Sequence, residues 1–282
     1  MKAKTIFLML ISTVSFAVVN GLIKFLENFS EFQLVFFRCA VSLVITIVQL
    51  KTLNIPFWGN NKPILLLRGI AGVTALMMGF ALIKHVPLGT AVMLNYLSPI
   101  FTAFIAVYWL KEVVRPIQWF YLLLCVLGVV ILKEGEVSLT LNYLLLGIGS
   151  SALAGLAYNC VRVCKETDHP LVVVLYFPLV GTPVSFLVLI LFRDWVWPNL
   201  NEWGLILLLG GFTQVAQITL TKALQTDKAA NATVLKYLGV VHAFLIGWLI
   251  FGEIVSWLSI IGTLIVLIGI VLFGLKKKVK EI

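Results

Sequence analysis

Ten apolar stretches, each close to the length of a membrane-crossing helix, follow one another along the chain. A helix that crosses a bilayer needs about 20 mostly apolar residues. Apolar residues make up 61% of this sequence and charged residues only 12%, too few to cover a water-exposed surface. We therefore expect an all-α membrane protein with ten transmembrane helices. They are expected at residues 5–25, 33–50, 64–83, 88–110, 117–133, 143–163, 171–192, 203–222, 229–251 and 256–275.

The first apolar stretch also has features of a secretory signal peptide. Lys2 and Lys4 precede it, and the small residues within 15–17 resemble a cleavage site. The apolar run nevertheless continues to Leu26, which makes it long enough to span, so we interpret it as the first membrane helix. The breaks between stretches are all short, so any function must lie within the membrane-embedded part.

The basic residues indicate how the helices are oriented, because Lys and Arg concentrate on the cytoplasmic side of membrane proteins. With the N-terminus inside, 14 of the 21 basic residues fall in cytoplasmic segments and four in outer loops. The remaining three, Arg38, Arg68 and Lys236, lie within predicted helices. This split predicts that both termini are cytoplasmic. Because the net charge of +9 comes mostly from helix ends, we expect no nucleic-acid partner.

The four cysteines all lie inside apolar stretches and lack the spacing of a disulfide framework or a zinc site. Cys160 and Cys164 share a helix face, so a soft-metal site is an alternative. We interpret them as small apolar packing residues. No metal site and no cofactor are expected.

An internal repeat divides the chain into two halves, residues 1–137 and 138–282. Residues 91–97 resemble residues 232–238 at a shift of 141, and the same shift places Glu112 on Glu253. Five helices per half is an odd number, so the second half is expected to be inverted relative to the first. Inverted five-helix repeats are typical of secondary transporters.

The repeated motifs carry a resemblance to a known family. In the first half they read Gly89-Thr90-Ala91, Tyr96, Ser98-Pro99 and Glu112, and in the second Ala232, Tyr237, Gly247 and Phe251-Gly252-Glu253. The chain resembles the drug/metabolite transporter superfamily, EamA ten-helix type, over essentially its whole length. The resemblance implies a bacterial inner-membrane carrier for amino acids or related metabolites, without identifying the substrate. His242 departs from the family pattern, where a plain apolar or aromatic residue is expected.

Charged residues inside a bilayer are costly and usually mark function. Lys236 and Arg38 are therefore predicted to line a polar cavity, with snorkelling toward the membrane surface as the alternative. Arg68, one turn inside the predicted cytoplasmic face, is interpreted as a snorkelling residue. Glu112 and Glu253 are interpreted as structural, accepting hydrogen bonds from the N-termini of neighbouring helices.

Uncharged polar residues complete the predicted cavity. Asn95 and Lys236 occupy matched positions in the two halves, so the lining is asymmetric on a symmetric frame. Hydrogen bonding between helices is the alternative for the amide side chains, and Tyr158 and Trp109 are interpreted as packing or interfacial aromatics. The predicted substrate-binding residues are Lys236, Arg38, Asn95, Tyr96, Tyr237, Gln214, Gln217, His242, Asn20 and Asn159.

No Asp or Glu lies in the middle of a predicted helix, so the cavity is expected to be electropositive. This favours a substrate with a carboxylate or phosphate, either an anion or a zwitterionic amino acid, and disfavours cationic drugs. If transport is proton-coupled, His242 is the best-placed titrating group, with a core histidine as the alternative.

These observations predict a secondary transporter that moves a small metabolite across the bacterial inner membrane by alternating access, with export favoured over uptake. The alternatives are a non-transporting sensor or assembly factor, a channel, and a membrane-embedded enzyme. The enzyme is disfavoured because the sequence lacks an acyltransferase motif, paired intramembrane aspartates and metal-spaced His or Cys. Partners other than lipid and substrate are not expected, and a monomer and a homodimer are both compatible with the sequence.

Overall fold

The chain folds into a bundle of helices in the computed structural model, which describes residues 1–26, 28–85, 94–131, 141–192, 195–239, 241–242 and 257–274. The helices are, in chain order, α1 (Ala3–Phe25), α2 (Glu31–Thr52), α3 (Lys62–His85), α5 (Ser98–Trp109), α6 (Pro116–Ile131), α7 (Leu141–Val163), α8 (Pro170–Phe192), α9 (Leu200–Thr226), α10 (Ala229–Val234), the 3-10 turn η1 (Leu235–Tyr237) and α12 (Trp257–Gly274).

Six of these helices are long and apolar enough to cross a membrane: α1, α2, α3, α7, α8 and α9. Shorter apolar helices cover Ser98–Trp109, Pro116–Gly128 and Ile260–Phe273. Many large apolar side chains on these helices are exposed, as expected where the surrounding solvent is lipid. The chain is therefore a multi-pass membrane protein.

The helices begin where the sequence supplies capping groups. Ser30 accepts a hydrogen bond from the Gln33 backbone N–H at the start of α2. Asn199 and Glu202 form a reciprocal capping box at the start of α9. Such caps satisfy backbone N–H groups that have no partner inside the helix. They explain why α2 and α9 start next to polar breaks in an otherwise apolar sequence.

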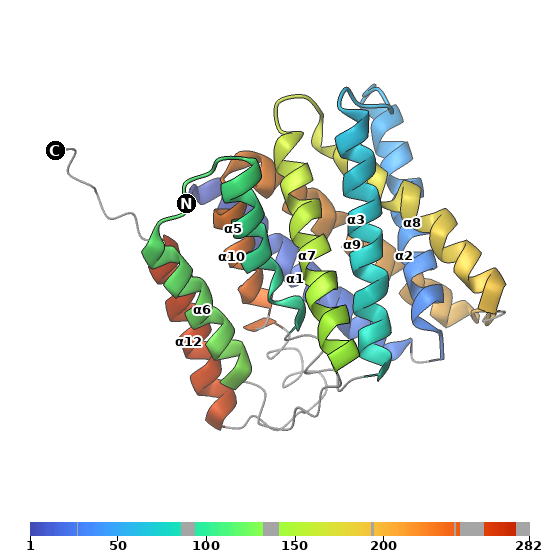
Figure 1. Cartoon of the computed structure of the whole chain (residues 1–282). Helices are drawn as coiled ribbons and strands as arrows, with labels where there is room; N and C mark the ends of the chain where they lie inside the picture. Colours follow the sequence, from blue (N-terminus) through green and yellow to red (C-terminus); the bar gives the residue numbers. More distant parts are fainter. Residues whose placement is uncertain are drawn as a thin grey trace.

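Helices from the two ends of the sequence pack in pairs. α1 packs on α9, α3 on α7, α2 on α8, α5 on α10, and α6 on α12, so each pair joins a helix before residue 132 to one after residue 140. Figure 1 shows α6 and α12 lying side by side at one edge of the bundle. Gly128 makes this contact close, since a Cβ there would lie 2.8 Å from the Gly262 carbonyl oxygen.

Polar contacts join the helices at the end of the bundle where α1 starts. Glu112 forms an ion pair with Arg162 (Nε to Oε1, 2.9 Å), and its other oxygen accepts the backbone N–H of Ala229 at the first turn of α10. Arg162 also donates to the carbonyl oxygens of Leu224 and Gln225. The prediction that Glu112 accepts a hydrogen bond from a neighbouring helix N-terminus is confirmed, whereas Glu253 lies outside the described residues.

Further contacts extend this group of charges across the same end. Asp168 accepts the backbone N–H of Asn60, in the segment between α2 and α3. Asp227, directly after α9, accepts the backbone N–H of Lys2. Burial would raise the pKa of Asp227, but hydrogen bonds from Lys2, Asn231 and Lys228 outweigh it and hold the pKa below its ordinary value of 3.8. We call the contacts of Glu112, Arg162, Asp168 and Asp227 the end network.

Candidate functional site

Two helices are interrupted at the positions that the repeat matches. Backbone turns at Tyr96 and Leu97 precede α5, and α10 gives way at Leu235 to the 3-10 turn η1. The sequence predicted continuous helices over 88–110 and 229–251, so the break at η1 was not anticipated. Short 3-10 segments inside helices often mark functional hinges, and membrane carriers commonly bind substrate where helices are discontinuous.

The two interruptions meet through their tyrosines. The Tyr96 and Tyr237 rings stack with 5.7 Å between centroids and an interplanar angle of 24°. Tyr237 is fully buried, and its hydroxyl has no hydrogen-bond partner among the residues that the structure describes. The tyrosine pair thus joins the break before α5 to the break after α10, close to the α5–α10 contact visible in Figure 1.

Lys236, in η1, reaches side chains of α5 and α7. Its Nζ donates to the Ser98 hydroxyl (2.8 Å) and the Tyr158 hydroxyl (2.9 Å), and it lies 4.6 Å from the centre of the Tyr158 ring. These contacts direct the ammonium group across the bundle toward α5 and α7, and all its partners are neutral. Tyr158, which the sequence assigned to packing, is instead a direct partner of a charged group.

Arg38 is buried on α2, with 7% of its surface exposed. Its guanidinium lies 5.9 Å from the centre of the Phe16 ring on α1. Its Nε has no hydrogen-bond partner within the described part of the chain. Arg38 therefore does not snorkel to the surface, and no carboxylate of the described residues pairs with its charge inside the bundle.

The position of Arg68 differs from the predicted one. We predicted that this residue snorkels to the cytoplasmic face, but only 5% of its surface is exposed. Its Nη2 donates to the Gln217 side-chain oxygen (3.1 Å), and its guanidinium stacks 4.8 Å from the centre of the Phe177 ring. The prediction is wrong because a partner on α9 and an aromatic ring on α8 hold the side chain in the interior.

The three cations share Tyr158 as a neighbour. Its phenol is bonded to Lys236 and lies within electrostatic range of both Arg38 and Arg68. Among the described residues, every Asp and Glu lies at a helix end or in a connection, none beside these cations. We call Arg38, Arg68, Lys236 and Tyr158 the cation cluster, and no acidic side chain in the described part of the chain balances its positive charge.

The two predicted glutamines of α9 differ in role. Gln217 is the partner of Arg68 and so belongs beside the cation cluster. Gln214 accepts from the Ser42 hydroxyl (2.5 Å) and donates to Thr46 (2.8 Å) and Gln49 (3.1 Å). All three partners of Gln214 are on α2, so this side chain holds α2 and α9 together.

The asparagines and His242 are dispersed. Asn159 is buried and donates to the Thr102 and Gly155 carbonyl oxygens, which ties α7 to α5. Asn95 faces Gly79 of α3, where its side-chain oxygen lies 3.5 Å from a Cβ placed on that glycine. Asn20 is exposed on α1. His242 is half-buried, and its Nδ1 has no partner in the described part of the structure.

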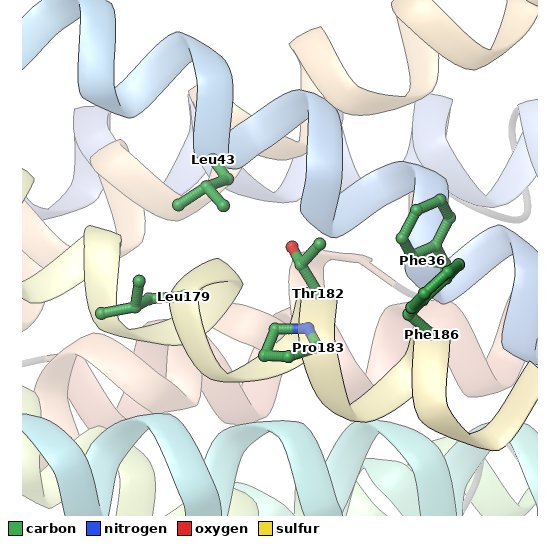
Figure 2. A pocket seen from close by; sticks show the side chains of 6 residues that line it. All are labelled: Phe36, Leu43, Leu179, Thr182, Pro183 and Phe186. Atoms are coloured by element: carbon green, nitrogen blue, oxygen red, sulfur yellow. The ribbon is translucent and has the colours of Figure 1, made fainter.

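Two surface grooves lie away from the cation cluster. Figure 2 shows a groove of about 440 Å³ between α2 and α8, lined by Phe36, Leu43, Leu179, Thr182, Pro183 and Phe186. A second groove of about 540 Å³ is lined by Phe186, Leu189, Ile190, Trp195 and Trp197. Their linings are almost wholly apolar and contain no member of the cation cluster. Such apolar linings suit lipid chains.

A multi-pass helical protein in which two interrupted helices meet beside buried cations has the features of a membrane transporter. The model of the EamA-like transporter family matches residues 3–133 and again residues 141–275. The chain therefore belongs to the EamA-like transporter family. It is a transporter and not an enzyme.

Named relatives agree with this assignment. The pseudopaline exporter CntI of Pseudomonas aeruginosa is 28% identical over 276 residues, covering 97% of this chain and 96% of that protein. Solute carrier family 35 member G1 of Homo sapiens is 26% identical over 93% of this chain and 76% of its own length. A riboflavin transporter of Vibrio cholerae is 25% identical over 93% and 90%.

A solved crystal structure has the same fold. It superposes with a TM-score of 0.87 and covers 97% of both chains, at 17% sequence identity. At that identity the likeness concerns the fold alone. The arrangement of helices is thus shared with an experimentally determined structure, while the residues at the cation cluster must be interpreted from this chain.

Proposed function

We propose that this protein is a secondary carrier that moves a small anionic or zwitterionic metabolite, an amino acid or a related compound, across the bacterial inner membrane. The observation that carries the proposal is the cation cluster, in which buried Arg38 and Arg68 and half-buried Lys236 have no acidic partner among the described residues. Burying such charges costs about 2.5–3.5 kcal/mol each on insertion scales. An anionic substrate offsets that cost.

The proposed mechanism is alternating access by two inverted five-helix halves, residues 1–137 and 138–282. The pairing of helices across the halves supports it. The α1–α9 and α3–α7 contacts are equivalent, because exchanging the two halves turns one pair into the other. The two matches to one family model support it as well. The interruptions at Tyr96 and Tyr237 fall at matched positions, where the halves can rearrange around a substrate.

The proposed orientation has ten transmembrane helices and both termini in the cytoplasm. It is supported by the excess of Lys and Arg in the segments that this orientation places inside. The end network then lies on the cytoplasmic side. Export is proposed as the direction of transport, and the name of the exporter CntI, a relative over nearly the whole chain, favours it.

His242 is the group proposed to couple transport to protons. Its half-buried imidazole has an Nδ1 without a partner in the described structure, so it is available to gain a proton. In His242→Gln, a proton gradient is expected to lose its effect on accumulation, while exchange of labelled for unlabelled substrate continues. Unchanged gradient-driven accumulation would remove His242 from the mechanism.

Counterflow in proteoliposomes tests the carrier directly. Vesicles preloaded with unlabelled amino acids or organic acids are expected to accumulate the matching labelled compound, which channels and sensors do not do. Lys236→Met should abolish the signal, whereas the matched control Lys62→Met, at the exposed start of α3, should retain it. Absence of counterflow for every compound, with folded protein in the vesicles, would reject the carrier.

A further inference from the structure

We propose that the substrate is a polyanion, with one oxyanion group bound at Lys236 and at least one more bound by Arg38 and Arg68. This inference rests on the proposed function and names the substrate class of the same site. It assigns Arg68, on the side of the bundle formed by α3 and α8, as a second anchor. The argument depends on which donors of each cation are already used.

Lys236 has two neutral partners and no charged one. The Ser98 and Tyr158 hydroxyls hold its Nζ at 2.8 Å and 2.9 Å and fix its direction. An ammonium group has three donors, so one remains after these two bonds. That remaining donor suits a single oxygen of a carboxylate or phosphate, and the two hydroxyls position the ammonium group to bind it.

The arginines have more unused donors. A guanidinium carries five N–H groups in a fixed plane. Arg68 uses Nη2 for Gln217, and its buried Nε has no partner in the described chain. The Nε of Arg38 is also buried and has no hydrogen-bond partner among the described residues. Because planar guanidinium groups bind carboxylate and phosphate through two parallel bonds, these edges fit oxyanions.

The described residues leave more than one positive charge to be balanced. Tyr158 is hydrogen-bonded to Lys236 and lies within electrostatic range of Arg38 and Arg68, and the described residues place no carboxylate with them. A monoanion bound at Lys236 leaves both buried arginines uncompensated, which is unfavourable at low dielectric. The anchors also come from both halves of the chain, with Arg38 and Arg68 on α2 and α3 and Lys236 on η1. A polyanion therefore spans the interface between the halves.

An anionic lipid headgroup is the other source of the same chemistry. The two apolar grooves, between α2 and α8 and around Trp195, suit lipid chains and do not include the cation cluster. Lipid chains in those grooves would leave the three cations unpaired. A soluble compound that enters the bundle is therefore favoured over a lipid.

The test compares acids that differ in the number of carboxylates. Tricarballylate has three, glutarate two and butyrate one, and each is added to the detergent-purified protein at matched ionic strength while its melting temperature is measured. A ligand that binds only the folded state raises this temperature, and at a fixed concentration the rise grows with the logarithm of its affinity. We expect the first two acids to stabilise the wild type and butyrate to have little effect.

Variants of the arginines then locate the second anion. Removing one member of a buried charge pair typically weakens binding by about 30-fold or more. Arg68→Gln should therefore weaken the binding of glutarate by that factor and leave the binding of butyrate unchanged. Arg68→Lys should recover part of the lost affinity for glutarate. Arg38→Gln provides the same readout if Arg68→Gln does not fold. Lys62→Gln, outside the cluster, should match the wild type.

Three results would overturn the polyanion site: equal stabilisation by butyrate and glutarate, equal loss for both acids in the arginine variants, or no stabilisation by any of the three acids. Stabilisation by phosphatidylglycerol that glutarate cannot displace would assign the cations to lipid and overturn it as well. Any of these results would still be compatible with counterflow of another substrate. Failure of the proposed function is distinct, because counterflow would then be absent for every compound.

Discussion

The end network and the cation cluster are two groups of charges in one bundle, and they differ in whether the charges are balanced. Arg162 is paired with Glu112, whose second oxygen accepts the Ala229 N–H, so this charge is neutralised by the protein itself. Among the described residues, Arg38, Arg68 and Lys236 contact hydroxyls, an amide and aromatic rings, but no carboxylate.

The difference separates structural charges from functional ones. A paired charge between helices stabilises their packing, and removing its partner is costly. A buried charge without a partner lowers stability unless something else supplies the counter-charge. We infer that the end network holds the helices together at one end, whereas the cation cluster is retained for a ligand. Each prediction below compares these two groups or the contacts next to them.

The largest effect is expected at the ion pair. Arg162→Met leaves Glu112 largely buried without its partner and frees the carbonyls of Leu224 and Gln225. The free energy of unfolding should fall by roughly 3 kcal/mol, measured as a lower melting temperature in detergent. Glu166→Gln is the matched control, because the Lys165–Glu166 pair is exposed and should contribute little. Equal effects of the two substitutions would contradict a structural role for the pair.

A smaller loss is expected where uncharged groups join helices. Gln214→Leu removes three hydrogen bonds to Ser42, Thr46 and Gln49, and hydrogen bonds between membrane helices contribute about 0.6 kcal/mol each on average. The variant should be destabilised by about 1–2 kcal/mol and should still perform counterflow. A variant that is stable but inactive would move Gln214 from helix packing to the substrate path.

The smallest loss depends on pH. The pKa of Asp227 is lower in the folded protein than its ordinary 3.8, so the charged form stabilises the fold above that value. This contribution is lost as the pH falls from about 4 through the folded pKa. The difference in melting temperature between wild type and Asp227→Asn should therefore shrink as the pH is lowered through this range. A difference that stays constant would show that the charge of Asp227 contributes nothing.

Much of the fold could be predicted from the sequence, because membrane helices are read from their length and apolarity alone. The prediction for residues 171–192, for example, agrees with α8 at Pro170–Phe192. The 3-10 turn at η1 could not be predicted, since residues 232–238 contain neither Gly nor Pro.

The candidate site was predicted less well. Placement of Lys236 within a membrane helix marked it as unusual, but its contact with Tyr158 depends on how η1, α5 and α7 pack. Arg68 was misplaced because its depth along α3 allowed snorkelling, and only the neighbours Gln217 and Phe177 reveal that it points inward. The sequence did contain a relevant feature, because three cations within predicted membrane helices lack a matching acid. The same reasoning that placed Lys236 and Arg38 in the interior applies to Arg68.

The melting temperature of ligand-free Arg38→Met tests the central claim most directly, because it requires no knowledge of the substrate. Methionine retains an apolar side chain for packing but removes a buried charge that has no hydrogen-bond partner at Nε in the described structure. If the cation cluster is kept for a ligand, this variant should melt at or above the wild-type temperature, in contrast to Arg162→Met. A decrease as large as that of Arg162→Met would show that Arg38 is a structural charge and would contradict the account.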